Sequence, residues 1–409
     1  MVGAAASASP GSVPVLRDPL LRLNAATFLL SVTIYSPILV LFYTGRGLSL
    51  FQVLSLEALN SAVITLFQIP TGAIADRIGL KRIVFAGHAL QGIWLIVLIA
   101  SHQYLFFLLG YAVLGVAISL RSGATEAWVF EILKQRGETS RMTQVQGTLW
   151  AASLVGRIAS ALLSIVVVRR NSDGYFVSAL ALSAVAFFLS AAIIATVPNV
   201  AVSIETQRRS LGALVRDGLY LFRTRPRFRH VAIATVVTDP LPYALLFLYQ
   251  PYFKAAGTPL ALYGFAAAAA AAVGAVVSRH VHRLETRIGA QRAFLVCTVV
   301  PSLLYLAMAL VFQAYIAAAL YVVTFGVMQA RYPLATALRN RHVESYNRAT
   351  ALSLISMLDG AWGFAAKLIV GRVADASLRT AFIVMGLVPL VTYAITRLRD
   401  DDVETIAET

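Results

Sequence analysis

Charged residues are scarce in this sequence. They make up only 13% of the 409 residues, whereas soluble domains carry about 25%. Hydrophobic residues account for 59%, and the mean hydropathy is +0.76. They fall in long uninterrupted runs rather than in amphipathic stripes, which is the membrane pattern. The composition therefore excludes an ordinary globular protein.

Cysteine and the common enzyme motifs are also scarce or missing. The single cysteine, Cys297, excludes an intrachain disulfide and a cysteine metal site. No H-E-x-x-H, G-x-S-x-G or G-x-x-x-x-G-K occurs, so the sequence supports neither hydrolysis nor direct ATP coupling. His280 and His282 have no third ligand nearby. We therefore expect no enzyme, no metal and no cofactor.

Long apolar runs fill most of the chain. A bilayer core takes about 20 apolar residues as helix, so about 12 spans joined by short loops use the available length. We predict an all-α polytopic membrane protein with helices at 23–43, 51–75, 83–100, 104–133, 145–168, 175–197, 230–253, 260–281, 293–312, 314–338, 349–374 and 378–395.

Basic residues predict the orientation of these helices. The net charge is +15, but it lies in loops between spans, so the anionic inner leaflet is a better partner than nucleic acid. One set of loops carries about four times as many Arg and Lys as the other. We expect a multi-pass protein of the cytoplasmic membrane, with both termini cytoplasmic. The set with few basic residues contains only Arg46, Arg169, Arg170, Lys254, Arg372 and Arg379.

A short polar connection follows the second span. It reads Pro70-Thr-Gly-Ala-Ile-Ala-Asp-Arg-Ile-Gly-Leu-Lys-Arg82 and leaves room only for a tight turn at a membrane surface. The pattern G-x-x-x-D-R-x-G-x-K-R in this position resembles the signature loop of the major facilitator superfamily of secondary transporters. A chance basic turn would explain the Arg and Lys but not Asp76 or the two glycines.

An internal repeat supports two similar halves. A shift of 210 residues takes Arg77, Ile78, Gly79 and Arg82 to Arg287, Ile288, Gly289 and Arg292. The same shift takes Arg121 to Arg331 and Ala127 to Ala337. The second loop is degraded, with Thr286 at the place of Asp76 and His282 at that of Gly72. The resemblance implies two six-helix bundles in parallel tandem.

This plan divides the chain into five parts. We expect a disordered tail at 1–18, which is not a signal peptide, and six-helix bundles at 19–197 and 230–397. Between them, 198–229 is a cytoplasmic linker, in which 210–223 is either an interfacial helix or a loose connection. An acidic tail follows at 398–409.

Two further stretches are similar to bacterial facilitators, including proton-antiporting drug exporters. They are Ser122-Gly-Ala-Thr-Glu-Ala-Trp128 and Arg348-Ala-Thr-Ala-Leu-Ser353. The fifth helix has Val155-Gly-Arg-Ile-Ala-Ser160 where the exporters tend to show a glycine-proline motif.

The resemblance implies a gating role for the first loop. Asp76 and Arg77 are expected to contact the helix end at 348–353 when the cytoplasmic side is shut, since a helix N-terminus stabilises a carboxylate. The residues that we assign to gating are Gly72, Asp76, Arg77, Gly79, Lys81 and Arg82.

Ionisable residues inside the apolar spans are the candidates for proton coupling. Such a charge costs about 2.5 to 3.5 kcal/mol on insertion scales, so it needs a partner, water or a proton. Burial raises the pKa of a carboxyl group and wetting restores it, which is the basis of coupling. The alternative is a permanent ion pair or a hydrogen-bonded structural carboxyl group. The candidates are Asp239, Asp359, Glu57, Glu126, Arg121 and Arg331.

Cations and aromatic residues within the spans are candidates for a substrate cavity. Arg157 and Lys367 would favour an anion or hold an acid ionised, although Lys367 also has a stem long enough to reach outward. Tyr35, Tyr243 and Phe247 are open to a pocket role. For Tyr252 and Phe253 we expect an interfacial aromatic belt instead.

These features predict a monomeric secondary transporter that uses protons and alternating access to move a small molecule. Efflux of amphiphilic or drug-like compounds is the first choice, and uptake or exchange of a small metabolite, either anionic or neutral, is the second. A transport-inactive receptor or scaffold with the same fold is the alternative from another class. The Ala- and Arg-rich usage suggests a bacterium.

Overall fold

Helices make up the folded protein. The computed structural model describes residues 18–199, 216, 220, 222–341 and 348–396; within these ranges the side chains of 68–73, 75–76, 226–227, 337, 340–341 and 348–353 are left undescribed. In this part of the chain there is no β-strand, and eleven helices are long and apolar enough to cross a membrane. Two shorter apolar helices, within 19–30 and 36–45, supply a first crossing in two pieces. The all-helical membrane fold is therefore confirmed.

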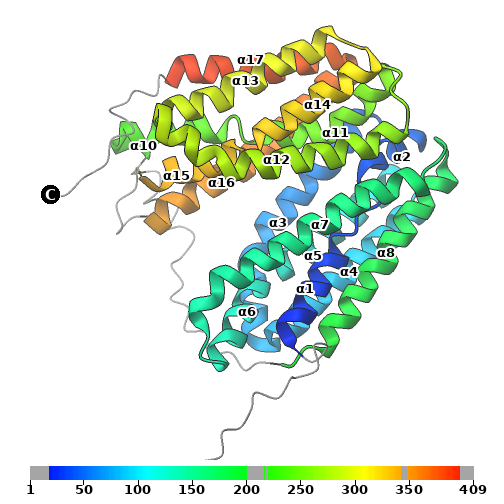
Figure 1. Ribbon diagram of the computed structural model, residues 1–409, viewed down its shortest axis with the longest axis vertical. Coiled ribbons are helices and arrows are strands. Elements are labelled where there is room, and N and C mark those ends of the chain that lie inside the picture. The colour runs from blue at the N-terminus through cyan, green and yellow to red at the C-terminus, as the bar shows by residue number, and fades with distance from the viewer. Residues whose placement is uncertain (1–17, 200–215, 217–219, 221, 342–347, 397–409) are drawn as a thin grey trace, which may run out of the picture.

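The first bundle is formed by residues 19–196 (Figure 1). Its helices are α1 (Pro19–Leu30), the 3-10 turn η2 (Ser36–Ile38), α2 (Leu39–Gly45), α3 (Leu50–Ile78), α4 (Leu80–Ala100), α5 (Tyr104–Arg121), α6 (Ala124–Gln135), the 3-10 turn η3 (Thr139–Arg141), α7 (Met142–Val167) and α8 (Asp173–Thr196).

The second bundle is formed by residues 226–396. Its helices are α10 (Pro226–Val236), α11 (Pro240–Ala255), α12 (Ala261–Ile288), α13 (Ala290–Leu310), α14 (Ala314–Met328), α15 (Arg331–Arg341), α16 (Arg348–Ala376) and α17 (Leu378–Thr396). Apart from four residues, the linker helix expected at 210–223 lies outside the described residues.

The first expected helix, 23–43, is wrong as a continuous element, because the chain unwinds between α1 and η2. Side chains of neighbouring helices satisfy the freed backbone groups. Ser160 Oγ accepts a hydrogen bond from the Thr33 N–H (2.9 Å), and Ser183 Oγ accepts one from the Ile34 N–H (3.0 Å). A buried backbone donor needs such a partner, so these serines make the break tolerable within an apolar bundle.

Three other expected helices are also interrupted. The segment 104–133 breaks at Gly123, whose φ of +75° suits glycine. The segment 230–253 breaks at Val237–Asp239, just before Pro240, which has no N–H to continue the helix. The segment 314–338 breaks at 329–330. The sequence stays predominantly apolar across all these breaks, so the apolar runs alone did not reveal them.

Two glycines form equivalent tight turns. Gly79 is the one residue between α3 and α4, with φ 89° and ψ 146°, and Gly289 is the one residue between α12 and α13, with φ 84° and ψ 158°. A positive φ strains any residue with a Cβ. The predicted tight turn is confirmed, and its recurrence 210 residues later shows that the repeat extends to backbone conformation.

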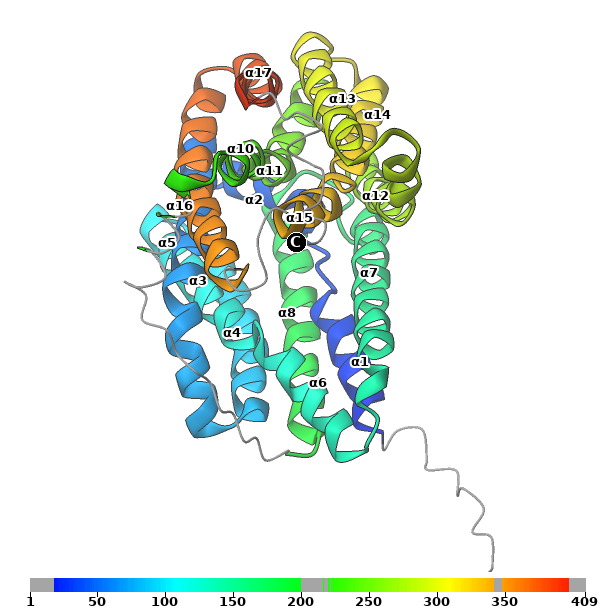
Figure 2. The ribbon, with the colours of Figure 1, turned by 90° about the vertical axis from the view of Figure 1, so that its left-hand side faces the viewer.

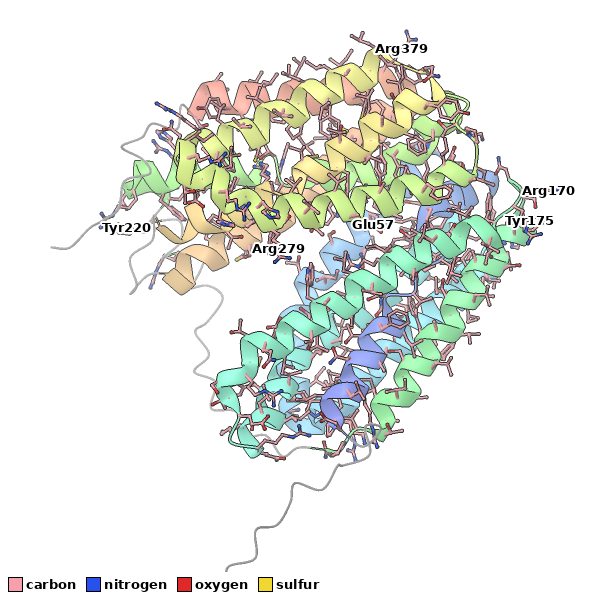
Figure 3. The ribbon with its side chains drawn as sticks, viewed as in Figure 1. Glu57, Arg170, Tyr175, Tyr220, Arg279 and Arg379 are labelled. Atoms are coloured by element: carbon pink, nitrogen blue, oxygen red, sulfur yellow. The ribbon has the colours of Figure 1, made fainter. Side chains whose placement is uncertain are left out.

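The bundles meet at one end of the molecule and diverge toward the other (Figure 1). We call the first the joined end; it carries the connections at Gly47 and Gly257. The other is the basic end; it carries the turns at Gly79 and Gly289 together with α6 and α15. Figure 3 places Arg170 and Arg379 at the joined end and Arg279 toward the basic end.

Two seams connect the bundles: α3 lies beside α16 and α7 beside α12 (Figure 2). Glycines allow close approach in both. A Cβ on Gly264 would clash with the Ala161 carbonyl oxygen, and one on Gly371 would lie 3.1 Å from the Leu54 Cβ. Small residues at such positions let helix backbones come close together in membranes.

An aromatic core fills the joined end of the second bundle. Tyr249 stacks on Tyr321 with ring centroids 4.2 Å apart. Tyr252 and Phe253 are fully buried there, and the Tyr252 hydroxyl donates to the Val311 carbonyl (2.5 Å). The expectation of an interfacial belt for these two residues is therefore wrong, because their rings pack against neighbouring helices instead of facing lipid headgroups.

Candidate functional site

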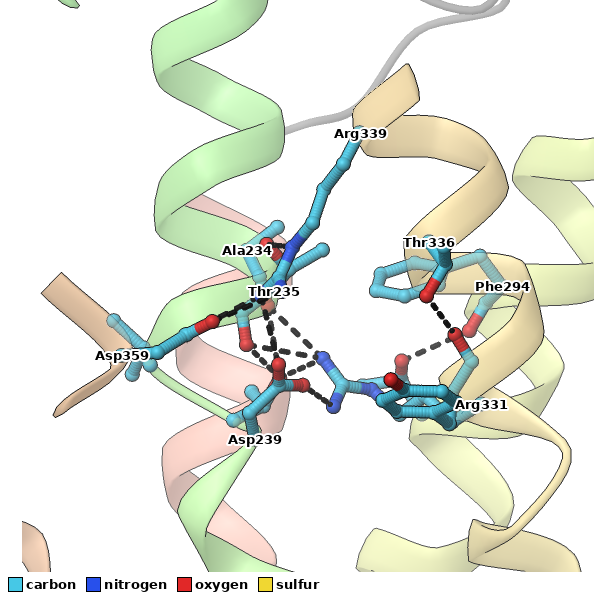
Figure 4. Close-up of polar contacts among 12 residues, drawn as sticks. Ala234, Thr235, Asp239, Phe294, Arg331, Thr336, Arg339 and Asp359 are labelled. Atoms are coloured by element: carbon cyan, nitrogen blue, oxygen red, sulfur yellow. Dashed lines mark hydrogen bonds and ion pairs between the residues drawn. The ribbon is translucent and has the colours of Figure 1, made fainter. Parts of the chain in front are cut away.

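Two carboxylates and two guanidinium groups form a network inside the second bundle (Figure 4). Asp239 lies at the break between α10 and α11, Arg331 and Arg339 on α15, and Asp359 on α16. Two negative and two positive charges balance formally. Such pairing lowers the cost of placing charged side chains inside a membrane protein.

Asp239 is held by both arginines. Its Oδ1 accepts from Arg331 Nη1 and its Oδ2 from Arg339 Nη2, each at 2.7 Å. Arg339 also donates through Nη1 to Asp359 Oδ2 at 2.9 Å and through Nη2 to Oδ1 at 3.3 Å. Arg339 therefore bridges the two acids, whereas Arg331 pairs with Asp239 alone.

The break before Pro240 anchors Arg331. Its Nη2 donates to the Ala234 carbonyl (3.2 Å) and to the Thr238 hydroxyl, and its guanidinium lies 5.0 Å from the centre of the Phe294 ring. Helix interruption leaves carbonyls without a backbone donor, and the arginine provides one. Its Nε is buried without a partner.

The sequence missed Arg339 as a functional residue. Arg339 lies two turns along α15 from Arg331, and its side chain is only 15% exposed. The signal was its spacing of eight residues from Arg331, which places both side chains on neighbouring parts of one helix surface.

Glu57 and Lys367 approach each other across the seam between α3 and α16, where Figure 3 shows Glu57 between the bundles. Lys367 Nζ donates to Ser61 Oγ (2.5 Å) and to the Glu57 carbonyl (3.4 Å), and it interacts electrostatically with the Glu57 carboxylate. The side chains of Asn60 and Tyr111 also interact with that carboxylate. Lys367 is buried and points into the seam, not outward.

A glutamine that the sequence did not single out also connects the bundles at the joined end. Gln250 on α11 is 1% exposed. Its Oε1 accepts from the N–H groups of Val40 (2.7 Å) and Leu41 (3.3 Å), and its Nε2 donates to the Ser36 carbonyl (3.0 Å). The unwound first crossing exposes backbone groups to which a side chain of the other bundle can bind.

Arg121 and Arg157 lie in the first bundle and interact electrostatically with each other. Arg121 ends α5, and Arg157 projects from the middle of α7 with its guanidinium 5.9 Å from the Trp150 ring centre. Glu126, on α6, is exposed and forms no ion pair with Arg121 or any other described residue. The structure does not bring Arg121 and Glu126 together.

The aromatic candidates occupy different places. Tyr35 is buried, with its ring edge against Trp94 at 5.6 Å. Tyr243 is 60% exposed and interacts electrostatically with Arg157 of the other bundle and with Asp239 and Asp359. Phe247 is partly buried against the aromatic core. Of the three, Tyr243 is the one that interacts with both acids of the network, whereas Tyr35 interacts with Glu57 and Arg157.

The gating prediction stays untested. Backbone positions of Gly72 and Asp76 fall in the last turns of α3, but their side chains, and those of the expected partners at 348–353, lie outside the described residues. Arg77 and Arg82 are exposed and Lys81 is partly buried, close to the turn at Gly79. Among the residues that the structure describes, no group of three or more His, Cys, Asp or Glu could hold a metal ion.

Comparison with known proteins agrees with this architecture. The profile of the Major Facilitator Superfamily matches residues 23–367, which is most of the chain. The chain belongs to the major facilitator superfamily. Among curated protein sequences none matches it.

Solved structures of other transporters share the fold of this superfamily member. The nucleoside transporter NupG has 13% identity, a TM-score of 0.78 and coverage of 93% of this chain and 98% of that chain. A bacterial homologue of the human lysosomal transporter Spinster, inward-facing and occupied, has 14% identity, 97% and 100% coverage and a TM-score of 0.76. A POT family transporter in complex with a thioalcohol-conjugated peptide has 15% identity, 94% and 96% coverage and a TM-score of 0.69.

Membership of the superfamily establishes the general role. The protein is a non-enzymatic, multi-pass membrane transporter of the major facilitator superfamily, and its cargo is a small molecule.

Proposed function

We propose that this protein is a proton-coupled secondary transporter that works by alternating access in the cytoplasmic membrane. The observation that carries the proposal is the network of Asp239, Asp359, Arg331 and Arg339 at the interrupted crossing of the second bundle. Interrupted helices at corresponding places in two repeats are the usual position of ion and substrate sites in transporters.

Asp359 is the proposed proton acceptor. Both oxygens of Asp239 are engaged by two different arginines, whereas Asp359 has Arg339 as its one ion-pair partner among the described residues. Asp359 also keeps 25% of its side chain exposed, so a proton can reach it. When Asp359 takes up a proton, Arg339 remains paired with Asp239, and the network gains one positive charge without leaving a buried charge unpaired.

The proposal of alternating access rests on how the two bundles contact each other along the two seams. Gln250, Lys367 and the glycine contacts bind the bundles toward the joined end, and the ribbons diverge toward the basic end. If the basic end faces the cytoplasm, as its arginines favour, this is an inward-facing conformation. The inward-facing conformation named for the Spinster homologue supports the same assignment.

A small polar or anionic metabolite is the cargo that the geometry supports best. Arg331 and Lys367 are engaged within the protein, but Arg157 is exposed. The related structures are named for nucleosides and for a peptide conjugate. Efflux of amphiphilic compounds is the second candidate, favoured by the exposed ring of Tyr243.

Proteoliposomes loaded with a pH-sensitive dye test the proposal. We expect at least one member of a panel of organic anions, sugars, nucleosides and dyes to cause proton movement when added outside. Asp359→Asn should abolish the proton movement, because the amide cannot exchange a proton. Glu138→Gln, which changes a surface acid paired with Arg141, should leave it unchanged.

Two results would contradict the proposal. Uptake of a compound by Asp359→Asn with unchanged proton movement would remove Asp359 from coupling. Absence of both cargo and proton movement for the whole panel, in protein that is folded and inserted, would favour the receptor alternative.

A further inference from the structure

The repeat places one arginine at the same point of each bundle, and the two have different surroundings. Arg121 is the last residue of α5, and Arg331, 210 residues later, is the first residue of α15. Each lies where a crossing is interrupted on its way to the basic end. Arg331 is paired with Asp239 and bonded to the chain at Ala234 and Thr238.

Arg121 lacks this neutralisation. Among the residues that the structure describes, no carboxylate lies within ion-pair distance of Arg121 or of Arg157, and Arg121 Nε is buried without an acceptor. Arg157 acts electrostatically on Arg121, and Arg121 in turn acts on His88, whose Nδ1 shares a hydrogen bond with Ser190. The first bundle therefore brings cationic groups together without an acid.

Packing holds this arrangement in place. A Cβ on Gly87 of α4 would lie 3.2 Å from the Arg121 Cβ and 2.8 Å from the Ala117 carbonyl oxygen. Gly87 therefore lets α5 lie close against α4, and it fixes the base of the Arg121 side chain. Two like charges repel strongly in a medium of low dielectric constant, so rigid packing is required to keep them near each other.

Arg157 is exposed on α7, with its guanidinium 5.9 Å from the centre of the Trp150 ring. It interacts electrostatically with Tyr35 on its own side and with the exposed Tyr243 of α11. Arg157 and Tyr243 thus interact electrostatically although they belong to opposite bundles, and Tyr243 also interacts with Asp239 and Asp359. An anion at Arg157 would therefore act electrostatically on both bundles, including the proton network.

We propose that Arg121 and Arg157 form the binding site for the anionic group, a carboxylate or a phosphate, of the cargo. A guanidinium fork binds either group through two parallel hydrogen bonds, and an anion between the two arginines replaces their repulsion with attraction. The inference rests on the proposed function only in taking the occupant to be the cargo. An anionic cargo would also explain the uptake of a proton at Asp359, since one proton balances one negative charge on the cargo.

Binding to purified protein in detergent tests the site without requiring transport. The probes are benzoate, benzyl phosphate and inorganic phosphate, with neutral benzamide as the uncharged comparison. Trp150 lies beside Arg157, so tryptophan fluorescence reports occupancy, and the thermal unfolding midpoint gives an independent readout. We expect at least one anion to bind and benzamide not to bind. The benzoate and benzyl phosphate arms distinguish a carboxylate from a phosphate.

Arginine variants localise the binding. Arg121→Gln and Arg157→Gln should each lower the affinity for the anion at least tenfold. Arg121→Lys should retain part of the affinity because it keeps the positive charge. Arg170→Gln, in an exposed connection at the joined end, is the matched control and should bind as the unchanged protein does. Failure of all three anions to bind, equal binding of benzamide, or less than a twofold effect of both glutamine variants overturns the proposal.

The anion site and the proton coupling of the proposed function can be tested independently of each other. Proton-coupled movement of a neutral compound with no arginine-dependent anion binding would overturn the anion site and leave proton coupling intact. Arginine-dependent anion binding in a protein that moves no protons would do the reverse.

Discussion

Single charged residues in this protein are stabilised by partners from distant parts of the chain. Lys367 and Glu57 illustrate this, because buried Lys367 donates to the Glu57 carbonyl across the α3–α16 seam and interacts electrostatically with the Glu57 carboxylate. The loss of one partner from a buried pair leaves an uncompensated charge, which costs about 3–5 kcal/mol in soluble proteins, whereas replacing both partners is far milder.

We therefore predict that Lys367→Met destabilises the protein by about 3 kcal/mol or more and that the double variant Glu57→Gln, Lys367→Met recovers most of this loss. Thermal and denaturant unfolding in detergent measure it as a double-mutant cycle. Additive effects of the two substitutions would show that the pair is not coupled.

The two acids of the network should differ in their effect on stability. Asp239→Asn removes the carboxylate from Arg331, which is 4% exposed, and leaves that guanidinium without an acid. Asp359→Asn leaves Arg339 paired with Asp239. We predict a clearly lower unfolding midpoint for Asp239→Asn and only a small change for Asp359→Asn. The reverse order would contradict the connectivity of the network, and the expected order makes Asp359→Asn the better variant for proton measurements.

At the scale of helices, close contacts across the seams determine which end of the molecule is joined. Gly264 on α12 lies against the Ala161 carbonyl and Ile165 of α7, with no room for a Cβ. The obstacle is backbone, which cannot rotate away as a side chain can. A larger residue there must push the two helices apart.

We predict that Gly264→Val shifts the population away from the conformation joined at this end. Spin labels at Thr139 and Arg283, both exposed at the basic end, should report shorter distances by pulsed electron resonance than in the unchanged protein. Gly174→Val is the control, because its Cβ would meet nothing within 4 Å. An identical distance distribution for Gly264→Val would show that the α7–α12 contact does not control the equilibrium.

At the scale of the whole molecule, the asymmetry of charge predicts the orientation in the membrane. The loops of the basic end carry the arginines of α12 and of the α6–α7 connection, and few basic residues lie at the joined end. Positively charged loops remain on the cytoplasmic side. The protein has one cysteine, Cys297, which is buried and can be replaced by serine to give a background without thiols.

We predict that single cysteines at Arg283 and Arg170 are labelled from opposite sides. In intact cells a membrane-impermeant maleimide should modify the cysteine at 170 and not the one at 283, and inverted vesicles should give the opposite result. Labelling of both positions from the same side would contradict the topology, and the reversed result would contradict the orientation.

The physical character of the chain was evident from composition and periodicity. Long apolar runs can be stable as transmembrane helices only when their backbone groups bond within each helix, so the all-α membrane fold followed from residue order. The turn at Gly79 and its repeat at Gly289 were also predictable, because a one-residue connection between helices needs a positive φ.

The charged sites were predictable only as a set of candidates. The sequence identified Asp239, Asp359, Arg331 and Glu57 because ionisable residues inside apolar runs are costly. It did not show that Arg339 joins Asp239 to Asp359, which are 120 positions apart, nor that Gln250 binds the unwound segment near Ser36.

Sequence by itself thus determined what the protein is made of: apolar helices, their approximate number, their division into two related halves and the sign of the charge at each end. Tertiary structure decided which charges are neutralised. Arg331 has an acid beside it, and its counterpart Arg121 faces another arginine. The reason is physical: periodicity and hydropathy depend on neighbours along the chain, whereas the environment of a buried charge depends on side chains brought to it by packing of distant helices.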